Sequence, residues 1–521
     1  MRQLTHRERR IGIAVLALAL FAFYSVTAWH VINLPVFSSP DETANFRFAQ
    51  QVRATGVPST STTLPGSPRS VLNTGIALVP GSFPFFPWLL GQIGHLAGTF
   101  GILMLGPILA TLAVFAWYSF LRRIGGPKRF ALYATVIFAT FPITWFYASR
   151  GLWQNGVFTS GIVLCLWLTA FTLKHRQWYF SILTGLVWGV TIMIRPSEVS
   201  WIAFGALVFV VSQWKRIPWR LVGIVVVTAV LPFILALSIQ RMTYGNATTV
   251  GYRTEGILAP AATLVHASVL AKVSNIFFPF GMNIRTAART FWHQYVYLFW
   301  FLFFPSAAGI CLLFFRKRSP NYVRWLLGAG CVSAFFLVML YGNYQFIEYP
   351  VSRVPTLDSS YERYWLPLIL LTSVGSGWLL YVMRRWQIGK FVMTLLLAGW
   401  LGWSSWTLWQ TNIGVRYSFP LFTQWQQQVR WVEASTSTNA VLVGVDKVVR
   451  PPRHAIGTNR NSPINVTILA SIARTKTPIY LLITTPSAVP EVVGSYPGFR
   501  AATVVIGPGG LTLAELQSTQ P

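Results

Sequence analysis

Long apolar runs separated by short polar links fill most of the chain. Runs of this kind form membrane-spanning helices, because about 17–25 helical residues are needed to cross a hydrocarbon core. We identify about eleven such runs and therefore predict an all-α polytopic membrane domain over residues 1–424. The predicted spans lie near residues 11–33, 100–121, 130–149, 155–173, 177–194, 197–214, 221–240, 294–315, 325–347, 364–383 and 391–412.

Basic residues gather on one side of these spans. Six short segments hold 20 Lys or Arg residues and a single acid, Glu8. The positive-inside rule assigns such segments to the cytoplasm. We therefore expect a multi-pass protein of the plasma (cytoplasmic) membrane with a cytoplasmic N-terminus and, after an odd number of spans, an extracytoplasmic C-terminus. The basic segments are residues 1–10, 122–129, 174–178, 213–220, 316–324 and 384–390.

Three long segments then form outer loops, at residues 34–99, 241–293 and 348–363. Two apolar stretches within them, 80–98 and 256–284, are expected to be juxtamembrane elements on the outer face rather than further spans. The first contains three prolines, and a crossing at either place would move basic segments to the outside.

The composition agrees with a membrane protein, since 54% of the residues are apolar and 10% are charged. The formal net charge of +29 would suggest nucleic acid in a soluble protein. Here the basic residues are scattered over short links that bracket apolar helices, so we expect membrane lipids as partners and no nucleic acid. Cys165, Cys311 and Cys331 lie inside predicted spans, which predicts no disulfide framework.

The last part of the chain, residues 425–521, has a different pattern. Short runs at 441–445, 479–483 and 502–506 are typical of strands, and turn-forming residues separate them. We predict a small α/β domain on the extracytoplasmic side. The Gly-Pro-Gly-Gly sequence at 507–510 lacks the lysine and the spacing of a phosphate loop, so we interpret it as a turn.

Two adjacent acids, Asp41 and Glu42, follow the first span directly in a chain with only 12 acids. One interpretation is structural, because a carboxylate is favoured in the first turn of a helix and Asp or Ser often caps it. The other is catalytic, because an acid at the boundary of water and lipid can act as a general base. Both can hold, since a helix that starts at Pro40 would fix the position of Asp41.

Three motifs resemble those of a known enzyme family. Pro-Asp-Glu at 40–42 precedes a Phe-rich stretch, a Gly-rich helix at 185–189 precedes Arg195, and Tyr-Glu-Arg-Tyr-Trp-Leu-Pro stands at 361–367. In this order they resemble the GT-C superfamily of membrane glycosyltransferases. The most similar members belong to glycosyltransferase family 39, with the dolichyl-phosphate-mannose protein mannosyltransferases and the lipid A aminoarabinose transferase. The resemblance extends over most of residues 1–385.

The resemblance implies transfer of a sugar from a polyprenyl phosphate donor to an acceptor hydroxyl at the outer face, with inversion. The acceptor is a protein, a lipid or a glycan. Asp41 is carried over as the general base, and Glu42 assists it or holds a neighbour. Because the leaving group is a lipid phosphate, the site also needs cations aimed at the developing charge, and the planar guanidinium of arginine suits phosphate oxygens.

Arg195 and Arg363 are the leading phosphate candidates, since each stands where an apolar helix meets the outer boundary. The alternative for Arg195 is an arginine that snorkels to lipid headgroups, and for Arg363 an ion pair with Glu362 or Asp358. Arg69, Arg285 and Arg289 in the outer loops are further phosphate candidates. The remaining candidates for the substrate pocket are Asn45, Arg47, Arg150, Trp153, Asn155, Tyr361, Glu362 and Tyr364.

The chain departs from the family at three places. Many relatives have His where this chain has Asn45, the aminoarabinose transferases have Arg where it has Ala44, and their lysine at the start of the second outer helix is missing near residues 84–88. Arg47, one turn from Ala44, is a possible substitute. The donor phosphate is therefore bound by a different set of residues here, or the donor differs.

The sequence contains no His or carboxylate cluster with the spacing of a metal site. Asp41 and Glu42 could still share a divalent cation, Mg²⁺ or Mn²⁺, with donor phosphate oxygens. Two other functions are open. A lipid or solute transporter or flippase would need ionisable groups near the middle of the bilayer, and a non-catalytic homologue would bind the lipid-linked glycan without transferring it.

Overall fold

The computed structural model describes residues 6–247, 249, 251, 278–315, 321–344, 357, 360–385, 387–409, 414–444, 448–449, 453–457, 466–484 and 486–519.

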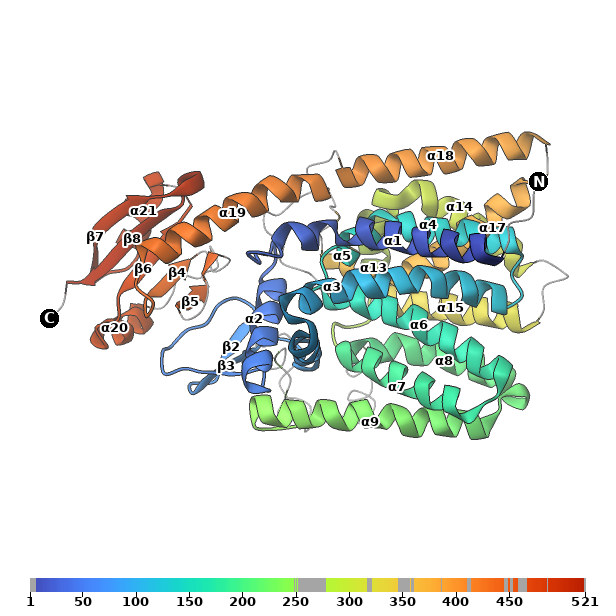
Figure 1. The fold of residues 1–521 in the computed structure, drawn as a ribbon, viewed down its shortest axis with the longest axis horizontal. Coiled ribbons are helices and arrows are strands. Elements are labelled where there is room, and N and C mark those ends of the chain that lie inside the picture. The colour runs from blue at the N-terminus through green and yellow to red at the C-terminus, as the bar shows by residue number, and fades with distance from the viewer. Residues whose placement is uncertain are drawn as a thin grey trace. The chain divides into compact units, whose positions relative to one another are not determined.

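Within these residues, eight helices are long and apolar enough to cross a membrane. A bent pair of helices and two shorter apolar helices occupy the other predicted spans. Each predicted span therefore coincides with helical structure, as the length and hydropathy of the apolar runs indicated. The long helices are α1 (His6–Val31), α3 (Phe85–Arg123), α6 (Gln154–His175), α8 (Val199–Gln213), α9 (Trp219–Tyr244), α14 (Tyr297–Phe314) with α13 (Ile284–Phe291) before it, α15 (Asn321–Gly342) and α18 (Gln387–Trp409) (Figure 1). The bent pair is α4 (Lys128–Thr140) with α5 (Pro142–Ala148), and the shorter helices are α7 (Trp178–Ile194) and α17 (Leu368–Met383).

Several of these helices contain breaks. The axes of α4 and α5 differ by 56°, and Pro142, which has no N–H to donate to the preceding turn, begins the second helix. In α3 the backbone leaves helical geometry at Ala97 and Gly98, whose φ is +61°. Within the predicted outer element at 80–98, residues 85–96 are thus helical, and this kink separates them from the rest of α3. The other predicted outer element, 256–284, lies largely outside the described residues.

The chain forms two compact units. The first comprises residues 1–28, 104–236 and 259–417, and the second comprises residues 29–103, 237–258 and 418–521.

Small residues bring the helices of the first unit together. A side chain at Gly309 of α14 would overlap the backbone of Gly375 in α17, and one at Gly205 of α8 would overlap Ser333 in α15. Such contacts allow close backbone approach where no hydrophobic effect drives association. Gly185, in the Gly-rich motif of α7, packs in the same way against Thr228 of α9.

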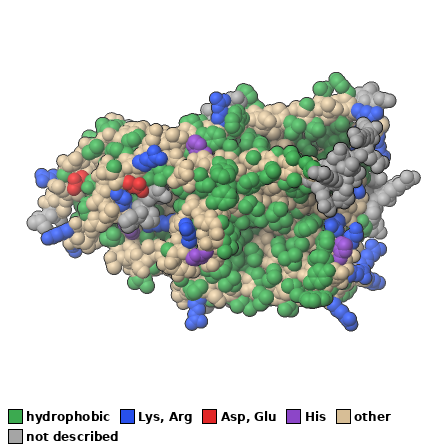
Figure 2. Space-filling view, viewed as in Figure 1, with side chains coloured by type: hydrophobic (Ala, Val, Ile, Leu, Met, Phe, Trp, Pro, Cys, Tyr) green, Lys and Arg blue, Asp and Glu red, His purple; other side chains and the backbone are tan. Residues whose placement is uncertain are grey.

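The outside of this unit is apolar. Val226, Val227 and Leu231 of α9 are each more than half exposed, and hydrophobic side chains cover much of the helical surface (Figure 2). A surface of this kind is stable against hydrocarbon and not against water.

The second unit contains α2 (Pro40–Thr55) and a small antiparallel sheet in the order β1-β3-β2. Phe48 of α2 is fully buried in a cluster with Val71 and Leu78 of this sheet. The helix is therefore packed against the loop that follows it. The strands are β1 (Thr60–Ser61), β2 (Val71–Asn73) and β3 (Ala77–Pro80).

The same unit contains a five-stranded sheet in the order β5-β4-β6-β8-β7. β4 pairs in parallel with β5 and β6, and β8 pairs antiparallel with β6 and β7. The predicted strands at 441–445, 479–483 and 502–506 are confirmed as β4, β6 and β7. The elements are β4 (Val441–Gly444), β5 (His454–Gly457), β6 (Ile479–Ile483), β7 (Phe499–Ile506) and β8 (Thr512–Ser518), with helices α19 (Val415–Ser435), α20 (Val466–Arg474) and α21 (Val489–Gly494).

The loop after α2 covers the edge strand β5. The Gly457 N–H donates to the Ser67 carbonyl at 3.0 Å, and Leu64 packs on the core of the five-stranded sheet. An exposed edge would offer unpaired backbone groups. This contact therefore satisfies part of the edge and connects the loop after α2 to the C-terminal sheet.

Candidate active site

Asp41 stands in the first turn of α2. The Ser39 side chain caps the helix by accepting the Asp41 N–H at 3.2 Å, and Pro40 occupies the first turn, where its missing N–H costs no hydrogen bond. The structural interpretation of the acid pair is thus confirmed, with Ser39 as the capping residue. The carboxylates of Asp41 and Glu42 lie in the favourable field of the helix N-terminus.

The Asp41 carboxylate is held by a residue that the sequence analysis did not identify. Ser70 Oγ donates to Asp41 Oδ1 at 2.6 Å. Ser70 has a φ of +60°, a left-handed conformation that is unfavourable for a residue with a Cβ, and its carbonyl accepts the Gly81 N–H at 3.0 Å. No sequence pattern marks Ser70, because its importance comes only from its contact with Asp41.

Glu42 is 2% exposed and accepts a hydrogen bond from Ser38 Oγ at 3.3 Å. Asn45 is also buried. At about 100° per residue, Asp41 and Asn45 share the buried face of α2. The opposite face contains Arg47, which is half-buried.

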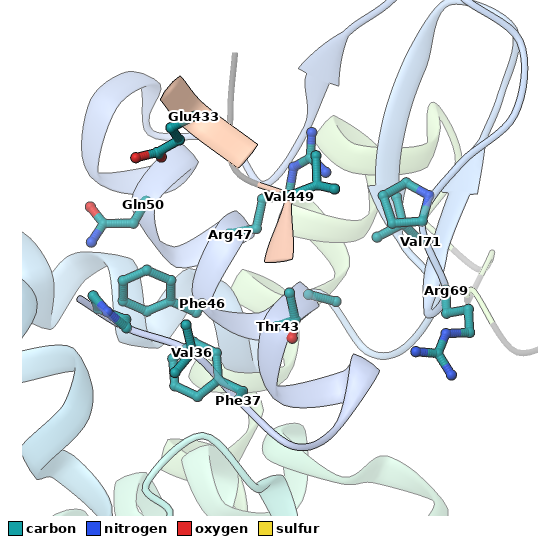
Figure 3. A pocket seen from close by; sticks show the side chains of 13 residues that line it. Val36, Phe37, Thr43, Phe46, Arg47, Gln50, Arg69, Val71, Glu433 and Val449 are labelled. Atoms are coloured by element: carbon teal, nitrogen blue, oxygen red, sulfur yellow. The ribbon is translucent and has the colours of Figure 1, made fainter. Parts of the chain in front are cut away.

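A cavity of about 310 Å³ lies along that opposite face. Figure 3 shows its side chains, with Phe46, Thr43 and Arg47 between Glu433 and Arg69. Two candidates from the sequence, Arg47 and Arg69, thus lie together in one cavity. The lining residues are Pro35, Val36, Phe37, Thr43, Ala44, Phe46, Arg47, Gln50, Pro68, Arg69, Val71, Glu433 and Val449.

In the first unit, Arg195 stands where α7 ends before Pro196. Its Nε and Nη2 donate to Glu198 Oε1 at 2.9 and 2.7 Å, and Nη1 donates to Asn155 Oδ1 at 3.2 Å. The residue is 4% exposed. Arg195 therefore does not snorkel toward headgroups, and a buried carboxylate balances its charge.

Glu198 is the second residue that the sequence analysis missed. It is 2% exposed, and its carboxylate also accepts hydrogen bonds from the Tyr341 hydroxyl and the Trp201 indole N–H. The available signal was the sequence Arg-Pro-Ser-Glu at 195–198, which places an acid three residues after the arginine. With Arg195, three side chains therefore donate to this one carboxylate in a buried network.

Arg363 belongs to the short helix α16 (Ser360–Tyr364). Its guanidinium lies 4.7 Å from the Trp153 ring centre and 5.1 Å from that of Tyr364. Its carbonyl accepts the Asn155 side-chain N–H at 3.0 Å. Asn155 therefore joins Arg195 to the backbone of Arg363. Asp358, one suggested partner of Arg363, lies outside the described residues.

The aromatic rings complete this cluster. Tyr364 stacks on Tyr341 with ring centres 4.3 Å apart, and its ring lies 4.8 Å from the Arg195 guanidinium. The structure thus brings together the three segments proposed from the sequence, around Trp153, Arg195 and Arg363. We call the set Trp153, Asn155, Arg195, Glu198, Tyr341, Arg363 and Tyr364 the arginine cluster.

Other candidates lie around this cluster or on the surface. Glu362 is fully buried, and the Tyr361 hydroxyl donates to the Tyr344 carbonyl at 2.7 Å. Arg150 is 8% exposed, with its guanidinium 4.1 Å from the Phe146 ring centre. Arg285 and Arg289 are exposed, one turn apart on α13.

Within the described part of the chain, no group of three or more His, Cys, Asp or Glu side chains is arranged to hold a metal ion. Asp41 and Glu42, the pair suggested for Mg²⁺ or Mn²⁺, each accept a hydrogen bond from a serine hydroxyl.

Comparisons with known proteins agree with this fold. Residues 79–238 match the family model described as dolichyl-phosphate-mannose-protein mannosyltransferase. No curated protein sequence matches the chain. Among solved structures, ArnT from Cupriavidus metallidurans bound to undecaprenyl phosphate is similar, with 12% identity and a TM-score of 0.56 over 98% of both chains.

Two further structures are similar in fold. The apo state of the same ArnT has 13% identity and a TM-score of 0.55, covering 97% of this chain and 98% of that one. The apo oligosaccharyltransferase from Archaeoglobus fulgidus has 12% identity and a TM-score of 0.50, covering 98% of this chain and 74% of that one. The resemblance to GT-C membrane glycosyltransferases that the motifs indicated is confirmed by the family match and the shared fold.

Proposed function

We propose that this chain, which has the fold of the GT-C membrane glycosyltransferases, transfers a sugar from a polyprenyl-phosphate donor to an acceptor hydroxyl. The observation that carries the proposal is the placement of Asp41. It follows the first span at the start of α2, and the Ser39 cap and the Ser70 hydroxyl fix its backbone and its carboxylate. A carboxylate held in this way is suited to be a general base.

In the proposed reaction, the acceptor oxygen attacks the anomeric carbon of the donor from the face opposite the phosphate. Asp41 takes the hydroxyl proton, the new bond from oxygen to carbon forms, and the bond from carbon to phosphate oxygen breaks. Polyprenyl phosphate leaves with the electron pair, and the anomeric configuration is inverted. Ser70 donates to Oδ1 of Asp41 and so orients the carboxylate that is proposed to receive the proton.

We assign the phosphate contact to Arg363. Its guanidinium lies against the faces of Trp153 and Tyr364, a setting that holds the planar group in one orientation. A fixed cation stabilises the charge that develops on the departing phosphate without reorganising during the reaction. Arg195, which the sequence analysis expected to bind the phosphate, is not assigned that contact, because Glu198 already balances its charge. We propose Arg195 as a positioning residue that acts on Arg363 through Asn155.

The sidedness follows from the basic segments. If they are cytoplasmic, the loop with Asp41 and the C-terminal sheet are extracytoplasmic, and the donor reaches the site from the outer leaflet. The acceptor is then a protein, lipid or glycan of the cell exterior. No step of this scheme requires a metal ion.

The test uses membranes that contain the full-length protein and a panel of radiolabelled polyprenyl-phosphate sugars. We expect Asp41→Asn to lower transfer by at least about a hundredfold, because removing a general base typically costs 10²–10⁴-fold. Donor binding, measured by photo-crosslinking of a polyprenyl-phosphate probe, should persist. Glu491→Gln, which changes an exposed acid of α21, is the matched control and should transfer normally.

Three other outcomes would contradict the proposal. Unchanged transfer by Asp41→Asn would exclude it as the base. Donor binding without transfer in the wild-type protein, over all donors and acceptors, would indicate a non-catalytic homologue. Movement of an intact lipid across vesicles without sugar transfer would indicate a flippase.

A further inference from the structure

The cavity on α2 is built from separate segments of the second unit. Thr43, Phe46, Arg47 and Gln50 recur at intervals of three and four residues, so they form one helical face. Residues of 35–37 and 68–71 form further walls, and Glu433 and Val449 complete the lining from the C-terminal part of the chain. A volume of about 310 Å³ falls at the lower end of the range of small-molecule sites.

The walls differ in chemistry. On one side, Phe37 and Phe46 have ring centres 5.3 Å apart. The polar lining includes Arg47, Gln50 and Glu433. A sugar ring fits such walls, because its C–H face packs against aromatic rings while its hydroxyl groups exchange hydrogen bonds with amide, guanidinium and carboxylate groups.

The charge of the lining favours an anionic sugar. Arg47 and Arg69 contribute two positive charges and Glu433 one negative charge. Arginine can bind a carboxylate in a bidentate manner, while a glutamate prefers a hydroxyl donor. Figure 3 shows Glu433 and Arg69 on different sides of the cavity, so a single ligand could meet both through different groups.

The cavity also reaches the segment that holds the proposed base. Arg69 and Val71 line it, and Ser70 between them donates to Asp41 at 2.6 Å. One segment of the chain therefore contributes both to a wall of the cavity and to the hydrogen bond that orients Asp41. An isoprenoid tail needs a wholly apolar path, so the mixed lining suits the acceptor better than the lipid donor.

We propose that this cavity is an acceptor subsite that binds a hydroxyl-rich, carboxylate-bearing sugar residue of a glycan. The assignment of the bound sugar as an acceptor rests on the proposed function, but the sugar binding itself does not depend on catalysis. It also gives the C-terminal part of the chain a role, since Glu433 of α19 and Val449 form part of the wall. Changes at these two positions should alter which glycan is accepted.

The experiment measures binding to the full-length protein in detergent by saturation-transfer NMR. The probes are glucuronate, glucose, inorganic phosphate and an N-acetylated peptide with two glutamates. We expect glucuronate to bind, glucose to bind at least about fivefold more weakly, and the other two to fail to displace glucuronate. Arg47→Gln should weaken glucuronate binding about tenfold, and Gln50→Ala should weaken it to a smaller extent.

The matched control is Arg53→Gln, because Arg53 is exposed on the same helix and does not line the cavity. It should bind glucuronate as the wild type does. Asp41→Asn should also bind glucuronate normally. The binding result is therefore independent of the result of the transfer assay. No glucuronate binding, equal displacement by phosphate, stronger binding of the peptide, or equal effects of Arg47→Gln and Arg53→Gln would each overturn the proposal.

Discussion

Ser70 donates a 2.6 Å hydrogen bond to the carboxylate of Asp41 from a backbone with a φ of +60°. Left-handed geometry costs roughly 1–2 kcal/mol for a residue with a Cβ, and such strain persists only where the surroundings enforce it. The same loop is attached to strand β5 through Ser67 and Leu64. The C-terminal sheet therefore helps to fix the residue that orients Asp41.

This relationship predicts opposite effects of two substitutions at Ser70. Ser70→Gly relieves the backbone strain but removes the donor, so the melting temperature should be unchanged or higher while kcat falls about tenfold and KM for the donor stays constant. Ser70→Asn keeps a donor and tolerates the left-handed region, so it should recover much of kcat. The measurements are thermal unfolding in detergent and steady-state transfer. Wild-type kcat in Ser70→Gly would show that the hydroxyl does not orient the base.

A second prediction concerns the buried pair of Arg195 and Glu198. Glu198→Gln leaves the guanidinium without its counter-charge, which typically costs about 3–5 kcal/mol for a buried pair. We expect a clear fall in the melting temperature. The double variant Arg195→Met with Glu198→Gln removes both charges and should be more stable than Glu198→Gln alone. Glu491→Gln, on the exposed surface, serves as the control, and an equal stability of all variants would contradict the prediction.

Arg363 provides a third prediction. Arg363→Lys keeps the positive charge but loses the planar group that lies against Trp153 and Tyr364. We expect kcat/KM for the donor to fall by about tenfold or more, a loss of about 1.4 kcal/mol or more of transition-state stabilisation. Arg53→Lys on the exposed surface of α2 should behave as the wild type. Full activity of Arg363→Lys would mean that charge alone, or another residue, binds the phosphate.

A fourth prediction concerns pH and His454 in β5. Burial, and then the charge of Arg47, lower the pKa of His454 below its ordinary value, so the fold favours the neutral imidazole. This contribution to stability is complete at pH values above about 6.5, the ordinary pKa of histidine. It is lost as the pH falls from there toward the lowered value, because the unfolded chain then binds a proton that the fold does not.

We therefore expect the melting temperature to fall between pH 7 and pH 5, and to fall less in His454→Gln. His95→Gln is the control, since His95 is exposed, and it should retain the wild-type pH dependence. An identical pH dependence in His454→Gln and the wild type would exclude this histidine as the source.

The sequence predicted those helices and strands whose formation depends on residues that are neighbours in the chain. The apolar spans follow from the length of each run, and β4, β6 and β7 follow from short apolar stretches between turns. It did not predict β5 or β8. β5 is short and is stabilised by contacts with residues 64–67, which lie far away in the chain.

The sequence likewise predicted some residues of the candidate site and not others. Residue type and motif order identified Asp41, Arg195 and Arg363 as candidates, because acids are rare in this chain and the order of the three motifs resembled a known family. Sequence could not assign their partners. Ser70 is 29 residues from Asp41, and Asn155 is 40 residues from Arg195 and 208 from the position of Arg363.

By itself, then, the sequence determined the membrane-spanning pattern, the α/β character of the C-terminal part and the residues capable of acid–base and phosphate chemistry, because hydropathy and side-chain chemistry are local properties. Tertiary structure alone decided that Glu198 balances Arg195, that Ser70 holds Asp41, and that a cavity forms between α2 and Glu433. These depend on distances between segments far apart in the chain, which the packing of helices and strands sets.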